Sequence, residues 1–114
     1  MHELGLVFQM ARVVEQALQG QQAEAIDTVV MEIGEISPVV PRYFEACFPA
    51  AADQCPLFQG AKLVIEKIPA RARCKRCETE FAVVENKGYC PACGSFDKEL
   101  LSGREFNIKE VLVR

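Results

Sequence analysis

The stretch 71-RARCKRCETEFAVVENKGYCPACG-94 decides the fold, because it holds four of the six cysteines of this 114-residue chain in the pattern C-x2-C-x12-C-x2-C. Two residues between paired cysteines let a tight turn aim both sulfurs at one point. The spacer, which includes "EFAVVE", can form a hairpin that brings the two pairs together. Four thiolates around one centre give the closed tetrahedral shell typical of structural zinc. The predicted zinc ligands are Cys74, Cys77, Cys90 and Cys93.

Other cysteine chemistries fit this spacing less well. A rubredoxin-like iron site uses similar paired cysteines, but nothing else in the sequence indicates electron transfer. A redox-active dithiol would not require a second pair at this distance. A catalytic zinc site needs an open position for water or substrate, and four thiolates leave none. Structural zinc is therefore the favoured prediction.

The segment 70–103 differs in kind from its surroundings, because it contains four cysteines and few large apolar side chains. So short a segment cannot bury enough apolar surface to fold alone, and metal binding must supply much of its stability. Alternating patterns on either side, "AKLVIEKI" and "EFNIKEVLV", predict two strands that flank it. We therefore expect residues 1–69 plus 104–114 to form one domain, with residues 70–103 inserted as a zinc-ribbon-like domain.

The outer domain is predicted to be a small three-stranded sheet with two helices, which makes the whole chain α+β. Apolar residues recur at helical spacing over 3–19, and Gly20 is a plausible stop signal. The stretch 25–34 alternates and predicts the third strand. A second helix begins near Pro41, and Pro49 should end or kink it because proline lacks the N–H that a helix interior uses.

Composition indicates a globular protein, with half of its residues apolar, a quarter charged and a formal net charge of −3. No stretch approaches the ~20 apolar residues of a membrane-spanning helix, and acidic Glu3 stands where a signal peptide would be basic. We expect a cytoplasmic protein that makes no membrane contact, with metal ligands and buried thiols in place of disulfides. Cys47 should pack as a small buried apolar group, and Cys55 should be a surface or loop thiol.

A zinc ribbon can also bind nucleic acid, and "RARCKR" concentrates four cations, Arg71, Arg73, Lys75 and Arg76. These cations can equally offset the excess charge of a four-thiolate zinc centre and solvate the surface. The chain as a whole is acidic, and the segment has few interleaved aromatics. We favour the charge-balancing role and do not expect nucleic acid as a partner.

The first residues, "MHE", contain the only histidine of the chain, His2. Because methionine before a bulky residue is normally retained, we expect a free Met1 amine, which titrates near pH 7.7–8.0. This amine, the backbone nitrogen of His2 and its imidazole Nδ1 can close fused chelate rings around one cation. The backbone nitrogen of Glu3 is a further candidate ligand. Such nitrogen ligation suits square-planar Ni(II) or Cu(II), and chemistry alone does not choose between them.

The motifs in their order resemble those of the HypA/HybF family of hydrogenase maturation nickel metallochaperones. They are the N-terminal Met-His-Glu, a helix, the strand "EIGEIS", the helix start "VVP" and the C-x2-C…C-x2-C insertion. Each motif alone is modest, but their order and spacing are specific and cover essentially the whole chain.

The resemblance implies a non-enzymatic nickel metallochaperone, with a nickel-binding α/β domain and an inserted zinc domain. It implies Ni(II) as cargo, bound by His2 with the Met1 amine and main-chain nitrogens of His2 and Glu3 in support, and structural Zn(II) on the four cysteines. The implied partners are a nickel-binding maturation GTPase and the large subunit of [NiFe]-hydrogenase. Some members of the family also supply urease, so urease maturation proteins are further candidate partners.

Two alternatives remain open from the residues alone. A zinc-ribbon binding module acting on nucleic acid or a protein complex would depend on the "RARCKR" cations and not on His2. A small oxidoreductase would contain iron or a redox-active dithiol instead of zinc.

Overall fold

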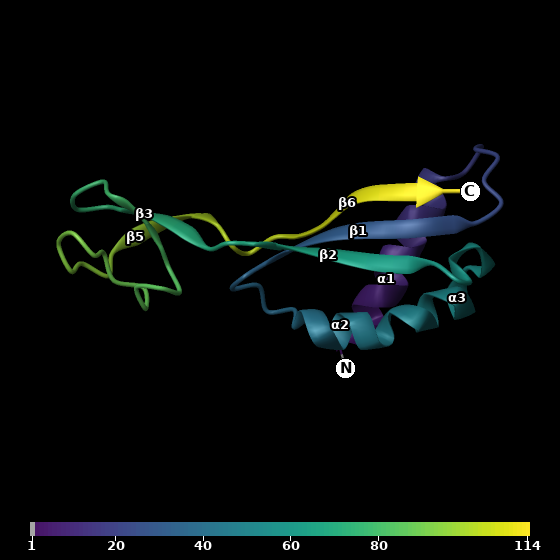
Figure 1. Cartoon of the computed structure of the whole chain (residues 1–114), viewed down its shortest axis with the longest axis horizontal. Helices are drawn as coiled ribbons and strands as arrows, with labels where there is room; N and C mark the ends of the chain where they lie inside the picture. The colour runs from purple at the N-terminus through teal and green to yellow at the C-terminus, as the bar shows by residue number, and fades with distance from the viewer. Residues whose placement is uncertain (1) are drawn as a thin grey trace. The chain divides into compact units, whose positions relative to one another are not determined.

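The computed structural model describes residues 2–114, and for His2 it describes the backbone alone. The elements before the cysteines are α1 (His2–Ala17), β1 (Ile26–Gly34), α2 (Pro41–Cys47), the 3-10 turn η1 (Phe48–Ala50), α3 (Ala51–Gln54), the 3-10 turn η2 (Pro56–Phe58) and β2 (Lys62–Ile68). The remaining elements are β3 (Arg71–Cys74), β4 (Glu80–Ala82), β5 (Lys98–Ser102) and β6 (Phe106–Val113), as Figure 1 shows.

The strands form two three-stranded sheets, one in the order β2-β1-β6 and one in the order β4-β3-β5. In the first sheet β1 lies between β2 and β6 (Figure 1). The first sheet and the helices confirm the predicted α+β class. None of the helices within residues 2–114 has both the length and the apolar character needed to cross a membrane.

The chain divides into two compact units. The first unit comprises the residues up to Glu32, Val39–Glu66 and Asn107–Arg114, and the second comprises Ile33–Pro38 and Lys67–Phe106. The second unit is larger than the predicted insert 70–103, because it also includes the segment after β1. That segment is hydrogen-bonded to the chain at both ends of the insert. Independent folding of residues 70–103 remains a prediction.

The core of the first unit is built from the buried faces of α1, β1 and α2. α1 buries Val7, Ala11 and Val14, which are at most 1% exposed, along the predicted apolar stripe. Ile26 of β1 and Phe44 of α2 are fully buried. Burying each large apolar side chain stabilises a fold by about 1.5–3 kcal/mol, so these buried residues contribute much of the stability of the first unit.

Pro49 has the effect predicted for it. α2 ends at Cys47, and the chain passes through η1, where Pro49 lies near the start, before a short α3 begins at Ala51. The proline ring removes one N–H donor, so a continuous helix would lose an internal hydrogen bond at this point. The result is a sequence of short turns in place of one long second helix.

Cys55 lies in the loop between α3 and η2, which is one of its two predicted placements, but it is not a surface thiol, since it is 2% exposed and packs in the core. The backbone N–H of Cys55 donates to the carbonyl of Ala51, and its carbonyl accepts from Phe58, so two successive turns fold around it. Burial raises the pKa of the Cys55 thiol and keeps it neutral. Cys47, which was expected to be buried, is half-buried.

The second unit is organised around β3, which pairs antiparallel with both β4 and β5. Ala72 lies opposite Phe81 on one side and Leu100 on the other. The buried cluster of this unit is small and consists of Ala72, Cys74, Phe81 and Cys90. Because two of its four members are cysteines, the core of this unit and its metal-binding residues overlap.

Candidate metal centre

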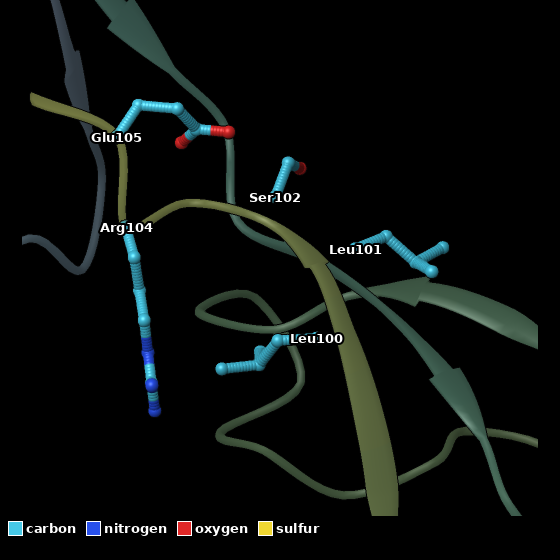
Figure 2. Close-up of a pocket in the computed structure, with 5 residues that line it drawn as sticks. All are labelled: Leu100, Leu101, Ser102, Arg104 and Glu105. Carbon is cyan, nitrogen blue, oxygen red and sulfur yellow. The ribbon is translucent and has the colours of Figure 1, made fainter. Parts of the chain in front are cut away.

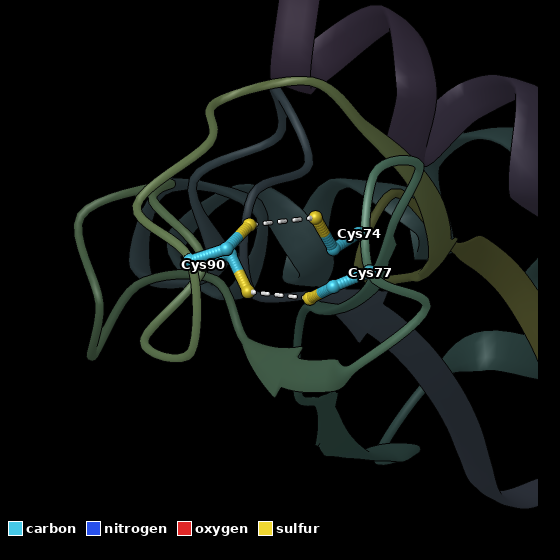
Figure 3. A group of neighbouring side chains, drawn as sticks. Cys74, Cys77 and Cys90 are labelled. Atoms are coloured by element: carbon cyan, nitrogen blue, oxygen red, sulfur yellow. Dashed lines mark hydrogen bonds between the residues drawn. The ribbon is translucent and has the colours of Figure 1, made fainter.

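The four predicted zinc ligands converge in the second unit. Their sulfur atoms all lie within 4.8 Å of one another. Cys74 Sγ lies 3.6 Å from Cys93 Sγ, and Cys77 Sγ lies 3.5 Å from Cys90 Sγ. Figure 3 shows the side chains of Cys74, Cys77 and Cys90 pointing toward one another.

These distances fit a tetrahedral zinc site. Zinc–sulfur bonds of about 2.3 Å in tetrahedral geometry separate the sulfurs by about 3.8 Å. The observed separations are close to that value, so the thiols need only small shifts to hold one ion. Four sulfur donors fill the coordination shell and leave no position for a substrate, which is the donor set of a structural site.

Each cysteine pair lies on a turn of the same construction. In the first turn, the backbone N–H of Glu78 donates to the carbonyl of Cys74 at 2.9 Å. In the second, the N–H of Gly94 donates to the carbonyl of Cys90 at 2.8 Å. The donor residue has a positive φ in both turns, 66° at Glu78 and 77° at Gly94. The C-x2-C spacing therefore produces two equivalent turns, and glycine stands at one of the two positions where a side chain is strained.

The turns also shift the acidity of their thiols. The Cys77 thiol donates a hydrogen bond to the Thr79 hydroxyl oxygen at 3.2 Å, and the hydroxyl can donate in return once the thiol is ionised. This contact lowers the pKa of Cys77 to about 6, with help from the Thr79 backbone N–H and from Cys90. The backbone N–H of Cys77 leads the causes that lower the pKa of Cys74. At Cys93, the backbone N–H of Ser95 also lowers the pKa of the thiol. Hydrogen bonds with the neighbouring thiols, together with burial, outweigh this effect and raise the pKa of Cys93 to about 11. The cluster thus contains two thiols whose pKa is lowered beside one whose pKa is raised.

Of the predicted nickel ligands, the backbone of His2 and the residue Glu3 lie at the start of α1. Met1 and the side chain of His2 are outside the described residues, so of this set only Glu3 can be described in full. Glu3 lies in the first turn of α1, and its side chain is 9% exposed. It lines a pocket of about 360 Å³ together with Tyr43, Ala46 and Cys47 of α2. The side chain of Glu3, whose backbone nitrogen is a candidate ligand, therefore shares this pocket with α2.

The motif "EIGEIS" has a structural role that the sequence analysis did not identify. The backbone N–H of Gly34 donates to the carbonyl of Glu105 at 2.7 Å, and that of Ile36 donates to Gly103 at 2.9 Å. A Cβ on Gly34 would overlap the Gly103 carbonyl. The only sequence signal was a glycine at the end of the strand, which is consistent with close backbone approach.

The side chains of Glu105 and Ser102 support the same stretch of backbone. Oε1 of Glu105 accepts a hydrogen bond from the N–H of Gly103 at 2.7 Å, and the Ser102 hydroxyl donates to the carbonyl of Pro69 at 2.7 Å. Both side chains line a small pocket of about 330 Å³, shown in Figure 2, with Leu100, Leu101 and Arg104. Both Ser102 and Glu105 therefore bond to the main chain here.

Comparison with known proteins identifies the family of this chain. The family model described as "Hydrogenase/urease nickel incorporation, metallochaperone, hypA" matches residues 1–113. The chain belongs to the HypA family. It is 40% identical to the hydrogenase maturation factor HypA of Geotalea uraniireducens and 37% identical to that of Geobacter sulfurreducens, and each alignment covers 99% of both chains.

Solved HypA structures have the same fold. The solution structure of the Ni metallochaperone HypA from Helicobacter pylori matches with a TM-score of 0.69 at 24% identity, over 97% of this chain and 96% of that one. A second HypA solution structure matches with a TM-score of 0.71 at 26% identity, over 100% and 97% of the two chains. The predicted family, the α+β fold, and the pairing of nickel with a structural zinc site are therefore confirmed. The family also establishes a role in nickel incorporation during hydrogenase maturation.

Proposed function

We propose that this HypA protein binds Ni(II) at its N-terminus and delivers it, together with a nickel-binding maturation GTPase, to the large subunit of [NiFe]-hydrogenase. The observation that supports this most is the family match over residues 1–113, whose description names nickel incorporation, in a chain whose only histidine is His2. The protein acts as a carrier and not as an enzyme, and it works in the cytoplasm. Urease maturation proteins are further candidate partners, since the family description also names urease.

The proposed nickel ligands are the Met1 amine, the backbone nitrogen and imidazole of His2, and the backbone nitrogen of Glu3. Consecutive nitrogens along a chain close fused chelate rings, and such donors favour square-planar Ni(II) over tetrahedral Zn(II). Binding requires loss of a proton from the amine, which is easy near neutral pH, and from main-chain amides, which is harder. The cargo site should therefore release nickel readily when a competing ligand set or a lower pH is offered.

The proposed zinc ligands are Cys74, Cys77, Cys90 and Cys93. Their convergence and the match to tetrahedral sulfur spacing support this assignment. Thiolate zinc is expected to stay bound under conditions that release nickel, because its closed shell offers no position for an incoming ligand. The two metals then have separate roles, one as cargo and one as part of the fold.

Nickel titration of the zinc-loaded full chain without a tag tests the proposal. His2→Ala should abolish the strong nickel site, and residues added before Met1 should weaken it by removing the free amine. Gln9→Ala, on the exposed side of α1, is the matched control and should bind as the native chain does. Nickel binding that is unchanged in both His2→Ala and the extended chain would rule out the amino-terminal chelate.

A further inference from the structure

A groove in the second unit is not explained by either metal site. It has a volume of about 770 Å³. The residues that line it are Ile36, Val83, Phe96, Asp97, Lys98, Leu100 and Arg104. Cavities of about 300–1,000 Å³ are typical of ligand-binding sites in proteins. We call this feature the Phe96–Arg104 groove.

The aromatic wall of the groove is exposed. The Phe96 side chain is 58% exposed, and Tyr89, whose ring centroid lies 5.0 Å from that of Phe96, is 54% exposed. Neither ring belongs to the buried cluster of the second unit. Two adjacent aromatic side chains outside the core leave apolar area in water, and such patches are characteristic of surfaces that bind other molecules.

The groove also has two cationic side chains. Lys98 Nζ lies 3.4 Å from the centroid of the Phe96 ring and donates to the Phe96 carbonyl at 3.1 Å. For the Arg104 guanidinium, no ion pair or hydrogen bond is found among residues 2–114. In Figure 2, Leu100 points toward the Arg104 side chain and Leu101 points the opposite way. An apolar surface thus lies directly beside a cation that lacks a counter-ion within the described chain.

We propose that the Phe96–Arg104 groove docks a short peptide segment of a partner protein in which apolar side chains are followed by acidic ones. Its apolar side chains would cover Phe96 and Leu100, and its carboxylates would pair with Arg104 and Lys98. Arginine binds carboxylates in a planar two-pronged geometry, which favours a carboxylate partner at this position. Asp97 contributes one opposing charge, so the groove selects a short acidic segment over a long polyanion.

A nucleic acid fits the groove less well. Single-stranded nucleic acids stack on aromatic rings, but they also need a positive track along the backbone. Basic and acidic side chains nearly balance in the second unit, and four zinc-bound thiolates add negative charge. The groove and Glu3 belong to different units, so a loss of nickel binding would not by itself contradict peptide binding in the groove.

The test is an NMR titration of the zinc-loaded, nitrogen-15-labelled full chain. The probe is an acetylated and amidated peptide with two leucines followed by four acidic residues. We expect shifts concentrated at Phe96, Leu100 and Arg104. Arg104→Gln should weaken binding by about two- to fivefold, the range of an exposed charge pair. The control Arg12→Gln removes the same charge from an exposed position on α1 and should leave binding unchanged.

Two comparison ligands make the result decisive. The same peptide with amides in place of carboxylates should bind more weakly, and added salt should weaken the acidic peptide toward that level. A thymidine oligonucleotide should not displace the peptide. The proposal is overturned if the acidic peptide causes no shifts in the groove, if both peptides bind equally, or if the oligonucleotide competes for the same residues.

Discussion

Oε1 of Glu35 accepts a hydrogen bond from the backbone N–H of Ala70 at 2.9 Å, and the backbone N–H of Glu35 donates to the carbonyl of Ile68 at 2.8 Å. The residue between these two partners is Pro69, which has no N–H to donate. Glu35 therefore fixes the backbone of the connection between β2 and β3, at the point where Pro69 offers no N–H for strand pairing.

Removing this side chain should destabilise the second unit. Glu35→Ala leaves the partly buried Ala70 N–H without its acceptor, and the loss of one such bond costs about 1 kcal/mol. Glu35→Gln keeps a carbonyl acceptor and should cost less. Urea unfolding of the zinc-loaded protein would measure both, with Glu85→Ala at an exposed position as the control. Equal stability of Glu35→Ala and the control would show that this hydrogen bond contributes nothing.

Gly34→Ala should be more damaging. A methyl group at residue 34 would overlap the carbonyl of Gly103 and approach Arg104 N to 2.6 Å. Backbone atoms cannot move aside as a flexible side chain can, so we expect a loss of about 1–3 kcal/mol. Gly5→Ala is the control, because no atom lies within 4 Å of its added Cβ and alanine favours a helix. Thermal unfolding that ranks the two variants in the reverse order would contradict this account.

The Thr79 hydroxyl should protect zinc against acid. The pKa of Cys77 is lowered to about 6, chiefly by this hydroxyl, so its thiolate persists until the pH falls through that region. Thr79→Val removes the donor and raises the pKa, so protons compete with zinc at higher pH. A colorimetric zinc-release assay across pH should show the midpoint moving upward in Thr79→Val.

Thr28→Val provides the matched control for this experiment. Thr28 lies on β1 in the first unit, and its hydroxyl is 3.4 Å from the Asp27 carboxylate. Its substitution removes the same hydroxyl far from the cysteines in sequence and should leave the midpoint of zinc release in place. A shift of similar size in both variants would mean that the Thr79 hydrogen bond has no specific effect.

Cys90→Ser should unfold residues 70–103 selectively. Cys90 is both a proposed zinc ligand and a member of the four-residue buried cluster, so its loss removes metal affinity and packing together. Hydrogen exchange should show lost protection in β3, β4 and β5 while α1 remains protected. Cys47→Ser, at a half-buried thiol outside the cluster, should change neither region. Loss of protection in α1 on the same scale would contradict the two-domain division.

Local patterns predicted the elements whose determinants are close in sequence. The apolar stripe of α1, the alternation in β1 and β2, and the break at Pro49 all depend on neighbouring residues, and each is present in the structure. β5 was not predicted, because Lys98–Ser102 is a short edge strand with partly exposed residues. Its extended conformation depends on pairing with β3, which the local sequence does not show. The burial of Cys55 was not predicted, because a cysteine beside a proline in a loop shows no sign of burial until the turns around it close.

The sequence by itself determined the zinc-type centre and the nickel-binding family. Paired cysteines dictate their own turn geometry, and an N-terminal histidine can form a chelate from its adjacent atoms. Only the tertiary structure decided which residues far apart in the chain support one another, such as Glu35 with Ala70 and Gly34 with Gly103. It also brought Ile36, Val83 and Arg104 to one groove. These relationships depend on strand register, which is set by the packing and hydrogen bonding of the whole sheet and leaves no periodic signal in any single segment.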